Sequence, residues 1–161
     1  MSRPTADGPA PRIRRANQRD LAAIVALLAD DEFGRGREAV GDRLDPRYRE
    51  AFEEIDRDPR SHLTVAVLGD RVVGTLHLTF LRYLTFEGGR RAQIEAVRVA
   101  SDLRGSGIGT ALFEWAIARS REQGAHVVQL TTDRRRAEAH RFYEALGFRA
   151  THDGMKLPLD P

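Results

Sequence analysis

The order of apolar and polar residues along the chain has two periods, which indicates that it forms both helices and strands. Residues 21–28 place Leu, Ile, Val and Leu at i, i+3, i+4 and i+7, the spacing of one apolar helical face. Residues 63–67 instead place Leu, Val and Val at alternate positions, as in a strand with one buried face. The predicted helices cover residues 21–28, 46–58, 107–122 and 137–146. The predicted strands lie around Ile13 and over residues 63–67, 72–86, 93–99, 127–131 and 148–157.

Several predicted boundaries coincide with residues that favour helix ends and turns. Asn17 precedes the first helix as a possible N-cap, and Pro46 takes the first position of the second helix. Gly69 begins a hairpin turn with Asp70, and Gly147 ends the last helix. The element order βα, α, ββ, βαβαβ predicts an α/β (α+β) fold, in which helices cover both faces of a mixed sheet.

The 161 residues fit a single domain, which we expect over residues 11–161. Residues 1–10 are rich in proline, alanine and glycine and are predicted to be a disordered lead-in, and the charged residues 30–45 are predicted to be a loop. No apolar run reaches the ~20 residues of a membrane span, and the lead-in lacks the apolar core of a signal peptide. We therefore expect a soluble cytoplasmic protein with no membrane partner.

Charge and residue usage argue against several classes of function. The 26 basic residues are offset by 24 acidic ones to give a net charge of +2. No basic cluster is interleaved with stacking aromatic residues, so nucleic acid is not an expected partner. The chain has no cysteine, and its five histidines do not have the spacing of metal ligands. Neither disulfides nor a metal site are expected.

Residues 104–109 read Arg-Gly-Ser-Gly-Ile-Gly and stand between a predicted strand and a predicted helix. Such a turn gathers unpaired backbone N–H groups at the positive end of the helix dipole, and its glycines let the backbone approach a bulky anion. No lysine follows Gly109, which excludes a Walker A loop, and Thr110 and Leu112 stand where a dinucleotide fingerprint needs glycine or alanine. The six residues alone fit either phosphate binding or a turn without a ligand.

Two motifs in fixed order resemble those of the Gcn5-related N-acetyltransferase (GNAT) family. The Arg-x-x-Gly-x-Gly of residues 104–109 resembles the family loop that binds the pyrophosphate of acetyl-coenzyme A, and residues 139–148 resemble its closing Ala-x-x-Phe-Tyr-x-x-x-Gly-Phe. The resemblance implies the GNAT fold, with a mixed, mostly antiparallel sheet of about six to seven strands, and acetyl-coenzyme A as co-substrate. The residues that it assigns to cofactor binding are Val97, Val99, Arg104, Gly105, Ser106, Gly107, Ile108, Gly109 and Thr110.

Glu95 and Tyr143 are the candidate catalytic residues. Transfer of an acetyl group from a thioester to an amine needs a base for the amine's proton and an acid for the departing thiolate. Glu95 alternates with Val97 and Val99, so we expect all three on one face of the strand before the glycine loop. The resemblance assigns the acid to Tyr143. The alternatives are a solvated strand glutamate and a tyrosine whose hydroxyl serves only packing and hydrogen bonding.

Residues 134–143 look most like the corresponding segment of aminoalkylphosphonate N-acetyltransferases, which implies a small primary amine with an anionic tail. Two positions depart from family patterns. Arg136 stands where the family often has asparagine, and Ala96 stands where polyamine enzymes usually have aspartate, which argues against a polycationic acceptor. Candidate partners of the anionic tail are Arg82, Arg90 and Arg91.

The expected function is an acetyl-coenzyme A-dependent N-acetyltransferase that acetylates a small-molecule primary amine by direct attack in a ternary complex. Because the chain has no cysteine, it cannot carry an acetyl group on a thiolate. The alternatives are a non-catalytic coenzyme A-binding regulatory module and a protein N-acetyltransferase. The oligomeric state is open, with a homodimer among the options.

Overall fold

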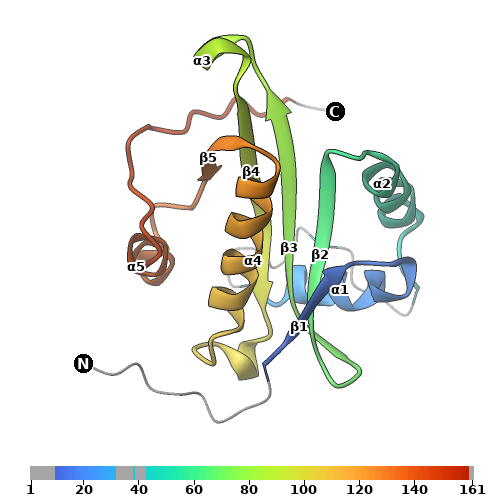
Figure 1. Cartoon of the computed structure of the whole chain (residues 1–161). Helices are drawn as coiled ribbons and strands as arrows, with labels where there is room; N and C mark the ends of the chain where they lie inside the picture. Colours follow the sequence, from blue (N-terminus) through green and yellow to red (C-terminus); the bar gives the residue numbers. More distant parts are fainter. Residues whose placement is uncertain (1–9, 32–37, 39–42, 160–161) are drawn as a thin grey trace. The chain divides into compact units, whose positions relative to one another are not determined.

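The computed structural model describes residues 10–31, 38 and 43–159 (Figure 1). Nine residues of the predicted lead-in and most of the predicted loop over residues 30–45 lie outside these ranges. The chain divides into two compact units, Met1–Gln129 and Leu130–Pro161, which we describe separately.

The first unit is built on a five-stranded sheet in which the strands follow chain order. The strands β1 to β4 pair antiparallel, whereas β5 joins β4 after a helical crossover, which makes the sheet mixed. All five strands lie at or around predicted positions, but the predicted strand over residues 72–86 is too long: β3 ends at Arg82, and Thr85 and Phe86 belong to a short helix, α3 (Thr85–Gly88). Their bounds are β1 (Arg12–Arg15), β2 (Ser61–Leu68), β3 (Arg71–Arg82), β4 (Arg90–Val99) and β5 (Ala125–Leu130).

The main helices also lie where the sequence predicts them: α1 (Leu21–Ala29), α2 (Pro46–Arg57), α4 (Ile108–Glu122) and α5 (Ala137–Ala145). Asn17 caps a short 3₁₀ turn, η1 (Gln18–Asp20), that leads into α1. Its side chain accepts a hydrogen bond from the Arg19 backbone N–H at 2.9 Å, and the Asp20 carboxylate accepts one from the Asn17 N–H at 2.8 Å. The capping signal in the sequence is therefore confirmed, one short turn before the α-helix itself.

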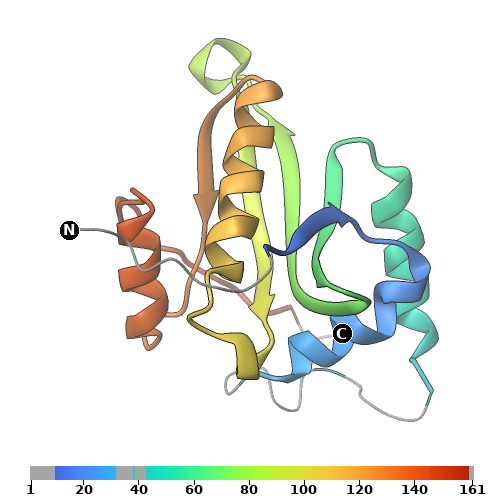
Figure 2. The ribbon, with the colours of Figure 1, turned by 60° about the horizontal axis from the view of Figure 1, so that its bottom comes forward.

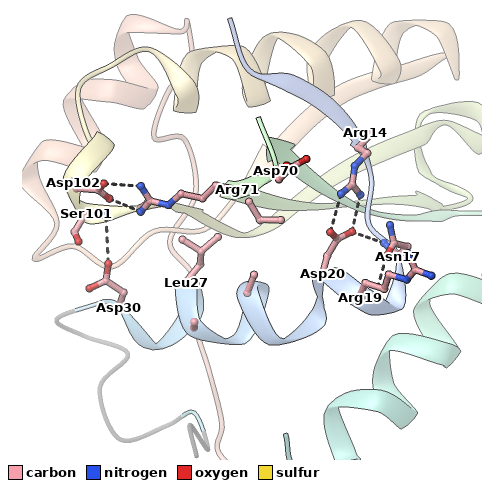
Figure 3. Close-up of a pocket in the computed structure, with 14 residues that line it drawn as sticks. Arg14, Asn17, Arg19, Asp20, Leu27, Asp30, Asp70, Arg71, Ser101 and Asp102 are labelled. Atoms are coloured by element: carbon pink, nitrogen blue, oxygen red, sulfur yellow. Dashed lines mark hydrogen bonds and ion pairs between the residues drawn. The ribbon is translucent and has the colours of Figure 1, made fainter. Parts of the chain in front are cut away.

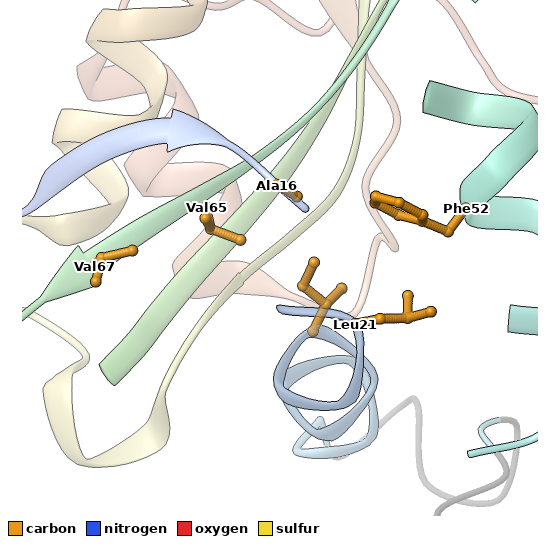
Figure 4. Close-up of a cluster of buried hydrophobic side chains, with 6 residues drawn as sticks. Ala16, Leu21, Phe52, Val65 and Val67 are labelled. Carbon is orange, nitrogen blue, oxygen red and sulfur yellow. The ribbon is translucent and has the colours of Figure 1, made fainter. Parts of the chain in front are cut away.

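Helices cover both faces of the sheet, as expected (Figures 1 and 2). On one face α1 and α2 pack on the strands, and side chains from both helices join β2 in a buried cluster (Figure 4). Full burial of a large apolar side chain contributes roughly 1.5–3 kcal/mol each. The buried members of this cluster are Ala16, Leu21, Ile24, Phe52, Val65 and Val67.

The opposite face of the sheet is covered by α4, which packs on β3 and β4. Leu112 and Phe113 of this helix have no exposed surface. The helix lies so close to β3 that a Cβ on Gly74 would come within 3.1 Å of both Ile108 Cγ2 and Leu112 Cδ1. Glycine at position 74 thus sets how closely the N-terminal end of α4 approaches the sheet.

The second unit contains α5 and a long segment without regular structure. The predicted closing strand over residues 148–157 is wrong, since none of these residues belongs to a strand. Its β-prone residues are few, and Gly154 and Pro158 interrupt or end the run, because glycine weakens a strand and proline removes a backbone donor. The sheet accordingly has five strands among the described residues, not the expected six to seven.

Candidate functional site

A β-bulge interrupts strand β4 immediately after Glu95. Glu95 pairs with His77 on β3, whereas Arg98 pairs with Thr75, so residues 96 and 97 together oppose a single residue of β3. Ala96 takes a φ of 53°, a left-handed conformation that is uncommon outside glycine. Bulges of this kind bend a strand and redirect its side chains, and they are frequent beside active sites.

The bulge overturns the expectation that Glu95, Val97 and Val99 share one face. Val99 pairs with Gly74, and Glu95 pairs with His77, which is three residues away along β3. Side chains three positions apart on a strand project to opposite faces. Val99 therefore lies on the α4 side of the sheet and Glu95 on the side of α1 and α2. The extra residue inserted at Ala96 is the physical reason, and period-two counting could not detect it.

The Glu95 carboxylate is exposed and is held by a neutral neighbour. Gln93, two residues earlier on the same face, donates a hydrogen bond from Nε2 to Glu95 Oε1 at 2.9 Å. Within the described residues, no basic side chain forms an ion pair with Glu95. One carboxylate oxygen is thus engaged by an amide, and the group as a whole is accessible to an incoming amine and its proton.

His77 faces Glu95 across β3 and β4 and shares a hydrogen bond of 2.6 Å between its Nε2 and Ser61 Oγ. Burial lowers the pKa of the His77 imidazole, and the negative charge of Glu95 partly opposes this effect. The imidazole is therefore neutral at neutral pH, and it places a polar but uncharged group beside the carboxylate.

The glycine loop has the backbone geometry that its sequence predicts. It follows a 3₁₀ turn, η2 (Ser101–Leu103), and leads into α4. Gly105 and Gly107 have φ values of 81° and 90°, in the left-handed region where a side chain is strained. No atom lies within 4 Å of the position that a Cβ would take at either glycine. The glycines are thus required by backbone conformation and leave open space outside the loop.

The first turn of α4 adds backbone donors directly after the loop. Ala111 is the first residue of the helix whose N–H bonds back along the turn, to Gly107 O at 3.0 Å. The N–H groups of Ile108, Gly109 and Thr110 precede it and have no partner within the helix. A helix N-terminus with free donors and no Cβ in the way is suited to a phosphate or pyrophosphate. The start of α4 and the glycine loop before it therefore have the backbone features of a phosphate or pyrophosphate site.

Two polar side chains of the loop have structural contacts of their own. Ser106 donates from Oγ to Leu103 O at 2.6 Å, which closes the turn. Arg104 donates from Nη2 to the carbonyl of Asp30 at 2.9 Å, so the loop is tied to the end of α1. Arg104 is otherwise exposed.

The arginines proposed for an anionic tail lie on different faces of the hairpin. Arg82 and Arg90 pair with each other on the α4 side, where Arg90 donates to the Gln123 carbonyl at 2.9 Å. Both therefore lie on the face opposite Glu95, and their contact with an anionic tail of the acceptor stays a prediction. Arg91 does share the face of Glu95, but its guanidinium stacks 5.1 Å from the Tyr83 ring at the hairpin tip. It is thus directed along the sheet away from Glu95.

Arg98 is a cation beside the bulge that the sequence analysis missed. It pairs with Thr75 and so projects from the same face as Glu95. Its Nη2 lies 3.0 Å from Asp31 Oδ2, and its Nη1 donates to Val97 O at 2.7 Å. Asp31 is buried and comes from the end of α1, so this ion pair ties that helix to the bulge. Nothing in the sequence relates Arg98 to Asp31, which is 67 positions away.

In the second unit, Tyr143 lies on α5 among aromatic rings. Its ring centroid is 5.5 Å from that of Phe142 and 6.1 Å from that of Phe148, both edge-on, and its carbonyl accepts the Phe148 N–H at 3.0 Å. These contacts fix the side of α5 from which the phenol projects. The neighbouring Arg134 and Arg135 form ion pairs with Asp153 and Asp133, consistent with a structural role.

A surface pocket of about 930 Å³ lies elsewhere in the first unit, along α1 and η2 (Figure 3). Its charged side chains largely neutralise one another, since Arg14 bonds Asp20 at 2.6 and 2.8 Å and Arg71 bonds Asp102 at 2.8 Å. The pocket contains neither Glu95 nor any residue of the loop over 104–109. Its size therefore does not mark it as the place of the chemistry.

The described residues contain no group of three or more histidine or acidic side chains that could hold a metal ion. Over the same part of the chain, no helix has the length and apolar character needed to cross a membrane.

Comparison with known proteins agrees with this geometry. The family described as acetyltransferase (GNAT) matches residues 21–148. The aminoalkylphosphonate N-acetyltransferase of Salmonella typhimurium is 30% identical over 148 residues, which cover 89% of this chain and 88% of that protein. The likeness to aminoalkylphosphonate enzymes expected from the sequence is confirmed.

Two further relatives extend the comparison. The L-methionine sulfoximine/L-methionine sulfone acetyltransferase of Pseudomonas aeruginosa is 29% identical over 145 residues, covering 84% of this chain and 78% of that protein. The crystal structure of a transcriptional regulator from Bacillus halodurans C-125 superimposes with a TM-score of 0.90 at 48% identity, covering 92% of this chain and 99% of that one. The family match over residues 21–148 includes the bulged strand and the glycine loop.

Proposed function

Since the chain belongs to the GNAT family of acetyltransferases, we propose that it moves an acetyl group from acetyl-coenzyme A to the primary amine of a small molecule by direct attack in a ternary complex. The proposal depends above all on one observation: the bulge in β4, the turn η2 and the N-terminus of α4 follow one another along the chain within one unit. This order sets an accessible carboxylate, an interrupted strand and a ready anion site along one continuous stretch of chain.

Acetyl-coenzyme A supplies the thioester whose acetyl group is transferred. In this proposal the free N–H groups of Ile108, Gly109 and Thr110 bind its pyrophosphate, with Arg104 as an additional cation. Backbone N–H groups at the bulge, near Val97 and Val99, pair with the pantetheine arm and polarise the acetyl carbonyl.

Glu95 serves as the base. The amine nitrogen forms a bond to the carbonyl carbon, and its proton passes to the free oxygen of the Glu95 carboxylate, directly or through one water. Collapse of the tetrahedral adduct breaks the carbon–sulfur bond, and Tyr143 gives a proton to the departing thiolate. One proton leaves the amine and one is delivered to sulfur, so the step is balanced without a covalent enzyme intermediate.

We propose a small amine with an anionic tail as the acceptor, in preference to a polyamine. The relatives with named substrates act on aminoalkylphosphonates and on methionine sulfoximine or sulfone, small molecules that carry an amine and an acidic or strongly polar group. In this chain Arg98 is a cation beside the bulge on the Glu95 face, and Ala96 provides no second carboxylate for a polycation. The non-catalytic coenzyme A module is not favoured, because both of those relatives are acetyltransferases.

A panel of amines tests the proposal. Acetyl-coenzyme A is incubated with the protein and with an aminoalkyl phosphonate, methionine sulfoximine, spermidine or a lysine peptide, and release of coenzyme A is measured. The expected result is the highest kcat/KM for the first two amines. A clear preference for spermidine or for the lysine peptide would contradict the proposed acceptor class, and amine-independent release would contradict transfer itself.

A further inference from the structure

The Glu95 carboxylate is the end point of a chain of side-chain amides that begins on the neighbouring strand. Gln129 of β5 donates from Nε2 to Gln93 Oε1 at 2.7 Å, and Gln93 of β4 donates from Nε2 to Glu95 Oε1 at 2.9 Å. All three residues belong to the first unit. We propose that Gln129 is a positioning residue, which orients Gln93 and through it the catalytic carboxylate. The inference rests on the proposed role of Glu95 as base.

Hydrogen-bond chemistry permits only one orientation of this chain. An ionised carboxylate has acceptors and no donor, so Gln93 must turn its NH₂ group toward Glu95. The Gln93 carbonyl then faces β5, and Gln129 must meet it with its own NH₂ group. A flipped amide at either glutamine would set two acceptors or two donors against each other. The three groups therefore form one polarised unit, which we call the amide relay (Gln129, Gln93 and Glu95).

Glu95 needs such support because of where it stands. Its side chain is exposed and lacks an ion pair within the described part of the first unit, and Glu95 directly precedes the bulge. A free glutamate loses considerable rotamer entropy when it is fixed. A base that is misplaced by about 1 Å can cost 10²-fold in rate, so a relay that holds one carboxylate oxygen and leaves the other for the proton has a direct kinetic value.

The relay also explains the position of a glutamine in β5. Residues 127–130 are otherwise Val, Val and Leu, which read as a buried strand, and Gln129 interrupts them. A glutamine there, half-buried beside β4, has its amide satisfied by Gln93. A solvated glutamine on the surface would need no hydrogen-bond partner on a second strand, whereas Gln129 has one in Gln93.

Substitutions at position 129 separate the relay from simple packing. Gln129→Met keeps the length of the side chain and removes the donor. Gln129→Glu keeps the polarity but presents an acceptor to the Gln93 carbonyl, which favours the wrong amide orientation. We expect Gln129→Met to lower kcat about 3- to 10-fold, the range of one hydrogen bond, and Gln129→Glu to lower it further. The KM for acetyl-coenzyme A should change less than about twofold.

A double-mutant cycle with Glu95→Gln gives the decisive readout. A positioning residue acts only through its target, so Gln129→Met should have no further effect in the Glu95→Gln background. The matched control is Gln123→Met at the end of α4, where the amide accepts from Arg90 instead, and it should leave kcat unchanged. The assay uses an aminoalkyl phosphonate and acetyl-coenzyme A, and thermal unfolding verifies that each variant is folded.

Each outcome bears on the proposal. An unchanged kcat in Gln129→Met, or the same loss in both backgrounds, would overturn the relay and leave the role of Glu95 intact. A wild-type rate in Glu95→Gln would overturn the proposed base and the relay together. If Glu95→Gln has no measurable rate, the kcat values of Gln129→Met and Gln129→Glu decide. A structural role of Gln129 predicts that Gln129→Glu keeps the higher kcat, because it retains a polar side chain. The amide relay predicts that Gln129→Met keeps the higher kcat.

Discussion

Glu95 on β4 and His77 on β3 lie opposite each other in the register of the sheet, so both side chains project from the face that α1 and α2 cover. His77 is held by Ser61 on β2, at 2.6 Å. The proposed base therefore has a neutral imidazole as its cross-strand neighbour, and any change in the charge of that imidazole acts directly on the site.

This pairing predicts how stability depends on pH. Burial lowers the pKa of His77 in the folded state. At pH values just below the ordinary histidine pKa of about 6.5, the unfolded chain therefore binds more protons than the folded chain. The free energy of unfolding should fall as the pH drops through this value and level off below the lowered pKa. His77→Gln removes that contribution. The free energy of unfolding, measured by urea denaturation at several pH values between about 7.5 and 5, should therefore depend less steeply on pH in this variant than in wild type. The same pH dependence of stability in the variant and in wild type would contradict a buried, neutral imidazole.

The glycine loop predicts a graded loss of acetyl-coenzyme A affinity. Arg104→Ala removes one charge-assisted phosphate contact and should weaken binding roughly tenfold. Gly107→Val should weaken it more, because φ is 90° there and a branched side chain both strains the turn and fills the open space proposed for the pyrophosphate. Titration calorimetry measures both. Gly154→Ala, in an exposed segment with open space around it, is the control. Wild-type affinity in both loop variants would remove the loop from the site.

The contact between Gly74 and α4 links the core to the loop. Gly74→Ala places a methyl group 3.1 Å from Ile108 Cγ2 and 3.2 Å from the Arg98 carbonyl, closer than such contacts normally allow. The neighbouring atoms must give by a few tenths of an ångström. We expect a loss of about 1–2 kcal/mol in the free energy of unfolding together with weaker acetyl-coenzyme A binding. Thermal unfolding with and without the co-substrate measures both effects. A stable variant with unchanged affinity would show that the helix position is not critical.

Most of the fold could be predicted from the sequence, because its signals are local. The helical spacing over residues 21–28, the Asn17 cap and the Pro46 start all have their expected positions. The glycine loop was predictable for the same reason, since its conformation depends on the glycines themselves. The predicted closing strand failed where local propensity was weak and Gly154 and Pro158 interrupt it.

The parts of the site that the sequence did not predict are non-local. The bulge at Ala96 depends on how two strands register, and an alanine gives no sign of a left-handed residue. The contact between Arg98 and Asp31 and the bond from Gln129 to Gln93 each join residues far apart in the chain. Such pairs follow from topology, so a single sequence read by period and motif cannot show them.

The proposed acid predicts a selective effect on turnover. Tyr143→Phe keeps the ring that packs on Phe142 and Phe148 and removes only the hydroxyl. The variant should fold normally and bind acetyl-coenzyme A with wild-type affinity, while kcat falls on the order of 100-fold, as for loss of a general acid. Steady-state kinetics and calorimetry on the same preparation measure the two quantities. An unchanged kcat would return Tyr143 to a packing role.

The central claim is that this chain acetylates a small amine with acetyl-coenzyme A, using Glu95 as the base. The most direct measurement is mass spectrometry of an aminoalkyl phosphonate after incubation with acetyl-coenzyme A and the protein, in parallel with Glu95→Gln. The account predicts an amine product that carries one acetyl group with the wild-type protein, and far slower formation with Glu95→Gln over the neutral pH range. Binding of acetyl-coenzyme A without any acetylated amine, across the whole panel, would contradict the account and indicate a non-catalytic coenzyme A-binding module.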